Sequence, residues 1–293
     1  MAAAPDIRSR RQWAGIYGRG IAMGIAEVVP GVSGGTIAFV TGIYDELIHT
    51  LASFRPASLR LLTNPTGFWQ AHNLSFLLAL GLGMLTGVAL FAHLLSLALE
   101  HARPVVWAFF LGVISLSVYL LGRDRSRRGL LLYLPIGLVL GVIMGTLDTS
   151  TIDARPWMFF LGGAVAVAAW LLPAVSGSFI LLALGLYEGV LAALVEVDLP
   201  IIAMLLGGCL TGLLCFANFL SWLMRHHREG LLSLLTGFMA GSLLRLWPWA
   251  NAEGALFTPA GYQQQLAADP LLVWVIVSFL AGTGVIWWLS RLK

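Results

Sequence analysis

VVPGVSGGTIAFVTGIYDELI (28–48) aligns without a gap with LLPAVSGSFILLALGLYEGVL (171–191), and seven of the 21 positions are identical. A second pair of segments, LTGVALFAHLLSLAL (85–99) and LTGLLCFANFLSWLM (210–224), shares seven of 15 positions and follows in the same order. Hydrophobic bias alone aligns leucine with leucine, but it does not produce Pro-x-x-Ser-Gly twice. Such self-similarity indicates an internal repeat. We therefore predict two homologous halves, residues 14–147 and 157–290.

The composition around the repeat is that of a membrane protein. Of the 293 residues, 59% are hydrophobic and 11% are charged, whereas soluble domains contain about 25% charged residues. A chain of this length forms only one or two ordinary cores, which cannot bury so much apolar surface in water. The composition excludes a soluble enzyme, a disordered protein and a nucleic-acid-binding module. We predict an all-α polytopic protein, with a single membrane domain over residues 1–293 and membrane lipids around it.

Several apolar stretches approach the length of about 20 residues that a membrane-spanning helix needs. They are residues 74–99, 105–121, 129–147, 199–224, 230–247 and 270–290. Two further apolar regions, 14–53 and 157–195, are interrupted by proline and glycine near their middles. Each interrupted region forms either two full helices or, as we favour, a re-entrant helical hairpin. Each half then has one broken hairpin and three transmembrane helices.

The positions of the cationic residues predict the orientation of the chain. If the N-terminus is cytoplasmic, 13 of the 17 Lys and Arg residues lie inside and three lie outside, with Arg19 within the first apolar region. Cytoplasmic loops of membrane proteins carry such an excess of positive charge. Both termini are therefore predicted to be cytoplasmic. Each half then crosses the membrane an odd number of times, so the two halves form an inverted-topology repeat.

The candidate binding site is the pair of Pro-x-x-Ser-Gly interruptions, residues 30–34 (the first break) and 173–177 (the second break). Irregular backbone within a membrane persists only where it is buried in protein or lines a polar cavity, and transporters direct the N-termini of broken helices toward anionic substrates. Pro30 is expected to end the incoming helix. Ser33 and Ser176 are placed to cap the outgoing helices, and the alternative is that capping is their whole role. The predicted phosphate-binding residues are Ser33, Gly34, Gly35, Thr36, Ser176, Gly177, Ser178 and Arg19.

Two ionisable residues lie in the first apolar region. Ionisable groups in membrane segments are costly and tend to mark substrate pathways or proton relays. Glu27 is aligned with Trp170 in the second half, so the shared scaffold does not require a carboxylate there. We predict a role for Glu27 in proton coupling or gating, with a structural ion pair to Arg19 as the alternative. Arg19 either attracts the anionic group or extends toward the cytoplasm.

No other pattern indicates chemistry. Thr86 and Thr211, each followed by glycine, are interpreted as helix-packing residues. Cys209 and Cys215 suit neither a zinc site nor a disulfide framework and are also interpreted as packing residues. No catalytic set, metal motif or cofactor motif is recognised in the apolar segments.

EVVPGVSGGTIAFVTGIYDELI (27–48) resembles a signature of the PopT-type polyprenyl-phosphate transporter family, formerly catalogued as a membrane domain of unknown function. LPAVSGSFILLALGLYEG (172–189) resembles the second signature, with Ala174 where the family commonly has glycine, as at Gly31. The resemblance covers nearly all of residues 14–290. It implies a flippase for undecaprenyl phosphate in the bacterial cytoplasmic membrane, which returns this carrier lipid to the cytoplasmic face for cell-envelope synthesis.

The residues alone leave other functions open. A secondary transporter of a small soluble anion would use the same breaks, and an intramembrane lipid phosphatase or an assembly subunit would also suit the composition. The energy source and a homo-oligomeric state are likewise left open.

Overall fold

The computed structural model describes residues 8–28, 33–55, 58, 63–145, 155–173, 175–251 and 255–291. These residues are almost entirely helical, and the β-type pairing among them is limited to an isolated bridge between Ala250 and Leu256. Within these described ranges, four helical segments are long and apolar enough to span a membrane: Leu74–Leu95, Leu97–Arg123, Leu199–His226 and Arg228–Leu246. A bent helix pair, Gly177–Ala183 and Tyr187–Glu196, makes a fifth if it is counted as one span. The all-α, multi-pass prediction is confirmed at this level.

The chain divides into two compact units, and each unit takes segments from both halves of the sequence. The first unit comprises Met1–Ala89 and Asp148–His226, and the second comprises Leu90–Leu147 and His227–Lys293. The two interrupted regions therefore lie together in the first unit.

The first unit contains two similar series of helices. Its elements are α1 (Arg10–Val28), α2 (Gly34–Val40), α3 (Tyr44–Ser53), α4 (Pro65–Ala71), the first part of α5 (Leu74–Arg123), α8 (Pro156–Trp170), α9 (Gly177–Ala183), α10 (Tyr187–Glu196) and α11 (Leu199–His226). Helices α2 and α9 begin and end at aligned positions of the repeat, and so do α3 and α10. Both interrupted regions therefore fold as a long helix, a break, a two-turn helix and a second short helix.

A glycine with positive φ forms the turn within each interrupted region. Gly42 between α2 and α3 has φ 78°, and Gly185 between α9 and α10 has φ 69°. Glycine adopts this conformation without the steric cost that a side chain brings. In the second region the turn bends the chain by 107°. The bend is that of a broken span or a re-entrant hairpin.

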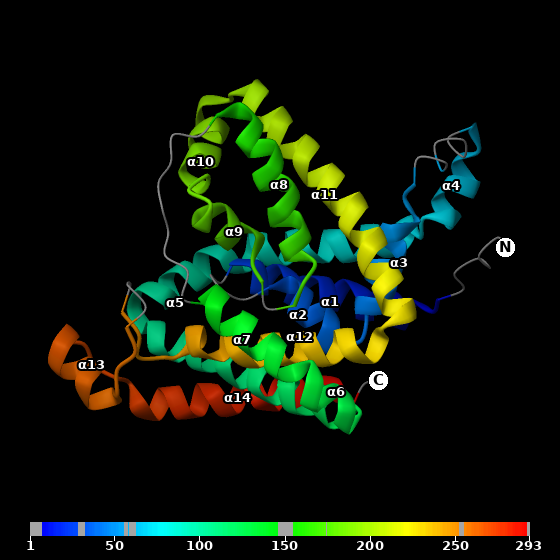
Figure 1. Ribbon diagram of the computed structural model, residues 1–293. Coiled ribbons are helices and arrows are strands. Elements are labelled where there is room, and N and C mark those ends of the chain that lie inside the picture. Colours follow the sequence, from blue (N-terminus) through cyan, green and yellow to red (C-terminus); the bar gives the residue numbers. More distant parts are fainter. Residues whose placement is uncertain are drawn as a thin grey trace. The chain divides into compact units, whose positions relative to one another are not determined.

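Aligned glycines bring long helices together in both halves. A side chain at Gly83 would overlap the backbone of Tyr17, and a side chain at Gly208 would overlap the backbone of Phe160, which is aligned with Tyr17. Helix α1 thus packs on α5 as α8 packs on α11, and Figure 1 shows α8 and α11 alongside each other. Small residues permit this close approach of helices in membranes.

The second unit pairs helices from opposite halves. It contains the second part of α5, α6 (Arg127–Leu132), α7 (Leu134–Gly145), α12 (Arg228–Ser242), η2 (Leu243–Leu246), α13 (Pro259–Leu266) and α14 (Leu272–Ser290). Gly237 of α12 lies against the backbone of Leu134, and Gly112 of α5 lies against that of Phe279 in α14. Each half therefore contributes one helix to each of these two packed pairs.

Two proline residues explain where predicted spans begin and end. The expected spans 74–99 and 105–121 are parts of α5, which is kinked at Ala102 just before Pro104. The expected span 129–147 is instead divided into α6 and α7 near Tyr133. Pro135 lacks the amide hydrogen that would continue the helix without interruption. The described part of α7, Leu134–Gly145, is shorter than a typical spanning helix.

Candidate functional site

The two breaks meet inside the first unit, and Glu27 joins them. One carboxylate oxygen of Glu27, Oε1, accepts a hydrogen bond of 2.6 Å from the amide of Gly34 and another of 2.7 Å from Nε1 of Trp170. Gly34 begins the helix after the first break, and Trp170 ends the helix before the second. Two donors from separate halves therefore converge on one anionic oxygen.

At the first break, Ser33 caps the N-terminus of α2. Ser33 has an extended backbone, and its hydroxyl accepts a hydrogen bond from the Gly35 amide at 3.1 Å. The amide of Thr36 bonds to the carbonyl of Ser33 at 3.0 Å. The four consecutive candidate residues Ser33 to Thr36 are all buried. Pro30 and Gly31 lie outside the described residues, and the last described residue of α1 before them is Val28.

The second break repeats the cap but is more accessible. Ser176 also has an extended backbone, and its hydroxyl accepts a hydrogen bond of 3.5 Å from Phe179 and lies 2.8 Å from that of Ser178. Ser176 is buried, whereas Gly177 is half-buried and Ser178 is exposed. Ala174, where the sequence departs from the expected glycine, lies outside the described residues. The two breaks therefore share a capping geometry and differ in exposure.

Further contacts hold the first break against the end of α8. The hydroxyl of Tyr44 donates a hydrogen bond of 2.8 Å to the carbonyl of Leu171, and Tyr44 is fully buried. A Cβ added at Gly35 would lie 3.0 Å from the carbonyl oxygen of Trp170. Glycine at this position lets the two halves touch through their backbones.

Arg19 is not brought to the breaks. It lies two helical turns before Glu27 on α1, and its Nη1 lies 3.2 Å from where a side chain on Gly15 would begin. The guanidinium therefore points back toward the start of α1. Among the described residues, Glu27 forms no ion pair with Arg19; its partners are the Gly34 amide and the Trp170 indole.

The two threonines bond within their own helices, and of the two cysteines Cys209 is packed against a neighbouring helix. The hydroxyls of Thr86 and Thr211 each donate to the carbonyl one turn earlier, at 2.8 Å. Cys209 packs close to Gly163, and Cys215 is exposed. Within the part of the chain that is described, no three His, Cys, Asp or Glu side chains gather in a way that could hold a metal ion.

A family profile described as undecaprenyl phosphate translocase-like matches residues 23–264 of the chain. The chain belongs to this family. The matched region includes both breaks, Glu27 and Trp170. The resemblance expected from the two signatures is therefore confirmed.

Two curated relatives of this translocase-like chain are named polyprenyl-phosphate transporters. The protein from Vibrio cholerae is 41% identical over 255 residues, which are 85% of this chain and 82% of the relative. The protein from Staphylococcus aureus is 30% identical over 264 residues, 81% of this chain and 87% of the relative. Both are named as transporters rather than enzymes. No solved structure matches the chain.

Two site residues of the translocase-like chain were missed by sequence reasoning. In the sequence Trp170 is identifiable only as the residue aligned with Glu27, and Tyr44 only as a tyrosine shared by the two aligned segments. The signal for Trp170 was present, because an indole N–H is a donor that seeks a partner when buried. The sequence could not show that the partner would be the aligned residue in the other half.

Proposed function

We propose that the chain transports undecaprenyl phosphate across the bacterial cytoplasmic membrane and returns it to the cytoplasmic face for use in cell-envelope synthesis. The observation that carries the proposal is the convergence of the Gly34 amide and the Trp170 indole on one carboxylate oxygen. Donors arranged to hold a carboxylate oxygen can also hold a phosphate oxygen. The names of the relatives support a polyprenyl phosphate as the substrate.

In this proposal the substrate phosphate replaces the carboxylate of Glu27 between the breaks. The phosphate accepts the hydrogen bonds now made to Glu27. Ser33 and Thr36, next to Gly34 and Gly35 in the chain, offer their hydroxyls as further donors. The second break contributes Ser176, Gly177 and Ser178. Arg19, displaced along α1, attracts the headgroup on its approach or departure rather than binding it at the breaks.

Alternating access follows from the duplication of the breaks. The first break is buried, whereas Ser178 in the second is exposed. We take the two halves to be inverted repeats that exchange these conformations, so that each break in turn is accessible from one side of the membrane. The difference in exposure between aligned residues supports this mechanism.

Glu27 gates the site and can carry a proton. A charged carboxylate competes with the phosphate for the same donors, and protonation weakens that competition. Glu27→Gln separates these roles from structure, because both hydrogen bonds end on the single atom Oε1 and an amide oxygen can accept both. We expect this variant to fold like the wild type and to lose the dependence of the transport rate on pH. Glu27→Ala loses both bonds and should be less stable.

The decisive experiment is transport in proteoliposomes made with purified full-length protein and a fluorescent polyprenyl phosphate. The fluorophore exposed in the outer leaflet is bleached by a reductant that cannot cross the membrane, so bleaching beyond the outer-leaflet fraction measures translocation. The Ser33→Ala, Ser176→Ala double variant should slow translocation at least tenfold. Ser117→Ala is the matched control, because Ser117 is a buried serine whose hydroxyl donates to the carbonyl of Val113 in its own helix.

Three outcomes would contradict the proposal. Translocation by wild-type vesicles that does not exceed that of protein-free vesicles would show that the chain does not transport the lipid. Loss of lipid transport when inorganic phosphate is added in excess would favour a carrier of small anions. Release of free phosphate from the lipid would favour a phosphatase.

A further inference from the structure

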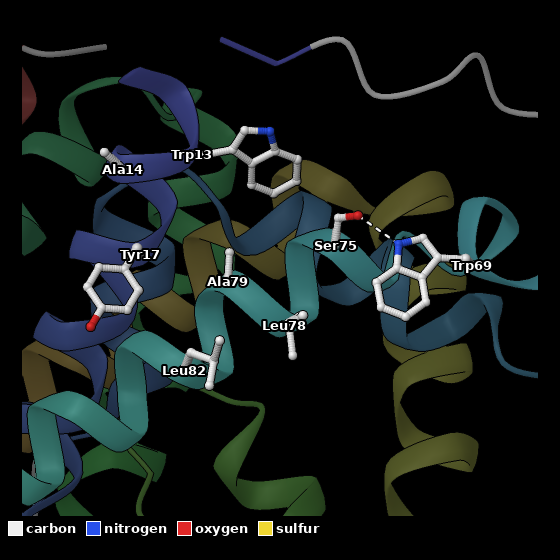
Figure 2. Close-up of a pocket in the computed structure, with 8 residues that line it drawn as sticks. All are labelled: Trp13, Ala14, Tyr17, Trp69, Ser75, Leu78, Ala79 and Leu82. Atoms are coloured by element: carbon white, nitrogen blue, oxygen red, sulfur yellow. Dashed lines mark hydrogen bonds between the residues drawn. The ribbon is translucent and has the colours of Figure 1, made fainter. Parts of the chain in front are cut away.

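A groove on the first unit lies away from the breaks and is bounded by α1, α4 and α5. Its volume is about 670 Å³, within the range of about 300–1,000 Å³ typical of ligand sites. Trp13 and Tyr17 of α1 form one side, Trp69 of α4 forms one end, and Leu78 and Leu82 of α5 lie along the floor (Figure 2). None of the described residues that line it is charged.

Hydrogen bonds fix the aromatic walls of the groove. The indole N–H of Trp69 donates to the hydroxyl of Ser75 at 2.8 Å, as Figure 2 shows. The hydroxyl of Tyr17 is 2.8 Å from that of Thr86 and forms a hydrogen bond with it. These bonds satisfy the polar ends of both rings and leave their apolar faces toward the groove. The groove is therefore preformed, which reduces the entropy lost when a flexible chain binds.

One end of the groove is basic. Arg10 begins α1 and is exposed, and it lies one turn before Trp13 and Ala14, on the helix face that also carries Tyr17. Arg11 follows it and is exposed as well. The guanidinium of Arg8 lies 5.3 Å from the centre of the Trp13 ring, but it is paired with Glu46 at 2.6 Å, so Arg10 and Arg11 supply the positive charge at this end. An uncharged, aromatic groove that ends in arginines matches a ligand with an anionic head and a long apolar tail.

We propose that this groove is a docking site for the substrate lipid, with the phosphate near Arg10 and Arg11 and the first isoprenoid units against the groove residues Trp13, Tyr17, Leu78 and Leu82. The inference rests on the proposed function and adds to it a second site on α1, distinct from the breaks. Tryptophan and tyrosine commonly lie at the membrane–water interface, so the groove suits a lipid whose headgroup is at the surface. Lipid would be captured or released here, and its headgroup would exchange with the breaks along α1.

Two substitutions on α5 test the site. Ala79→Trp places an indole within the groove, where Ala79 is half-buried. Leu85→Trp is the control, because Leu85 is 68% exposed on the same helix and does not line the groove. We expect Ala79→Trp to weaken equilibrium binding of a fluorescent polyprenyl phosphate to full-length protein in phosphatidylcholine nanodiscs at least tenfold. Leu85→Trp should remain within twofold of the wild type.

A second measurement keeps the test valid if Ala79→Trp is unstable. A photoreactive benzoylphenylalanine at Leu78 should cross-link to radiolabelled polyprenyl phosphate. Unlabelled polyprenyl phosphate should compete, whereas equal concentrations of phosphatidic acid or inorganic phosphate should not. Arg10→Gln should reduce the yield and its dependence on salt.

The outcomes separate this proposal from the function itself. Equal binding by Ala79→Trp and Leu85→Trp, or equal competition by phosphatidic acid, would overturn the docking site and show a surface that any lipid can cover. If the docking site is overturned in this way but the wild type still transports polyprenyl phosphate in proteoliposomes, the proposed transport function stands without the docking site. If the cross-link is specific but no transport is measured, the site stands and the transport function fails.

Discussion

Replacing Trp170 with phenylalanine removes the hydrogen bond that links the two halves while keeping an aromatic ring. Nε1 of Trp170 donates to Glu27 at 2.7 Å. Among the described contacts, the Gly34 amide is the other donor to that carboxylate. After the substitution, Glu27 keeps only the bond from Gly34. We expect the free energy of unfolding to fall.

The magnitude follows from the type of bond that is lost. A hydrogen bond to a charged group contributes about 1.5–3 kcal/mol, and every 1.4 kcal/mol or so is a tenfold change in an equilibrium constant. The ratio of folded to unfolded protein should therefore decrease by about ten- to a hundredfold. Trp157→Phe is the matched control. It makes the same chemical change on α8 at a residue that is 51% exposed, so we expect a change within about 0.5 kcal/mol.

The assay is reversible unfolding in mixed detergent–lipid micelles, followed by far-UV circular dichroism. A double-mutant cycle with Glu27→Ala isolates the pair, because Trp170→Phe should cost little once the acceptor is gone. Equal stabilities of Trp170→Phe and Trp157→Phe would refute the reasoning. So would an undiminished effect of Trp170→Phe in the Glu27→Ala background, since the effect would then come from packing alone.

Three other perturbations test the same region and one neighbouring element. Tyr44→Phe leaves a buried backbone carbonyl without its donor and should destabilise the protein by about 1–2 kcal/mol, whereas Tyr187→Phe should have little effect; thermal unfolding of both variants provides the comparison. Gly42→Ala forces a side chain into a positive-φ turn and should cost about 1–2 kcal/mol in the same measurement. Burial lowers the pKa of His72 below its ordinary value, so the unfolded chain takes up the proton first as the pH falls through about 6.5. Stability should therefore decrease between about pH 7 and 5, by at most about 1.4 kcal/mol per unit, and His72→Phe should remove that part of the decrease in melting temperature.

Each of these predictions has an internal control or a clear failure. A loss in Tyr187→Phe equal to that in Tyr44→Phe would mean that the bond to the second half is unimportant. An unchanged stability of Gly42→Ala would show that the turn relaxes. His72 is buried and stacks on Phe54, so a pH profile that is the same in His72→Phe would place the titrating group elsewhere.

The local structure of the breaks could be predicted from sequence because it depends on short-range patterns. Ser33 and Ser176 cap their helices, and Gly42 and Gly185 form the turns, at aligned positions. Backbone conformation at such positions is set by the residue types within a turn or two. The division of the predicted span 129–147 was missed although Pro135 signalled it.

The contacts between halves could not be predicted, because a repeat shows equivalence and not proximity. Glu27 and Arg19 lie on roughly the same helix face, which made an ion pair plausible. Eight residues of helix separate their backbones by about 12 Å, and the packing of α8 supplied Trp170 instead. The sequence likewise contains no information on which copy of a duplicated helix pairs with which, as in the second unit, where α12 packs on α7.

The bond between Glu27 and Trp170 bears on how this chain arose. The two residues are aligned in the sequence repeat, so in this bond a residue contacts its own aligned counterpart. In a symmetric dimer of identical single-repeat ancestors, that position would hold either two carboxylates facing each other or two indoles with no acceptor between them. A carboxylate opposite an indole therefore requires two halves whose sequences differ at this position. The fused chain could thus acquire an asymmetric centre that no homodimer of one repeat could encode.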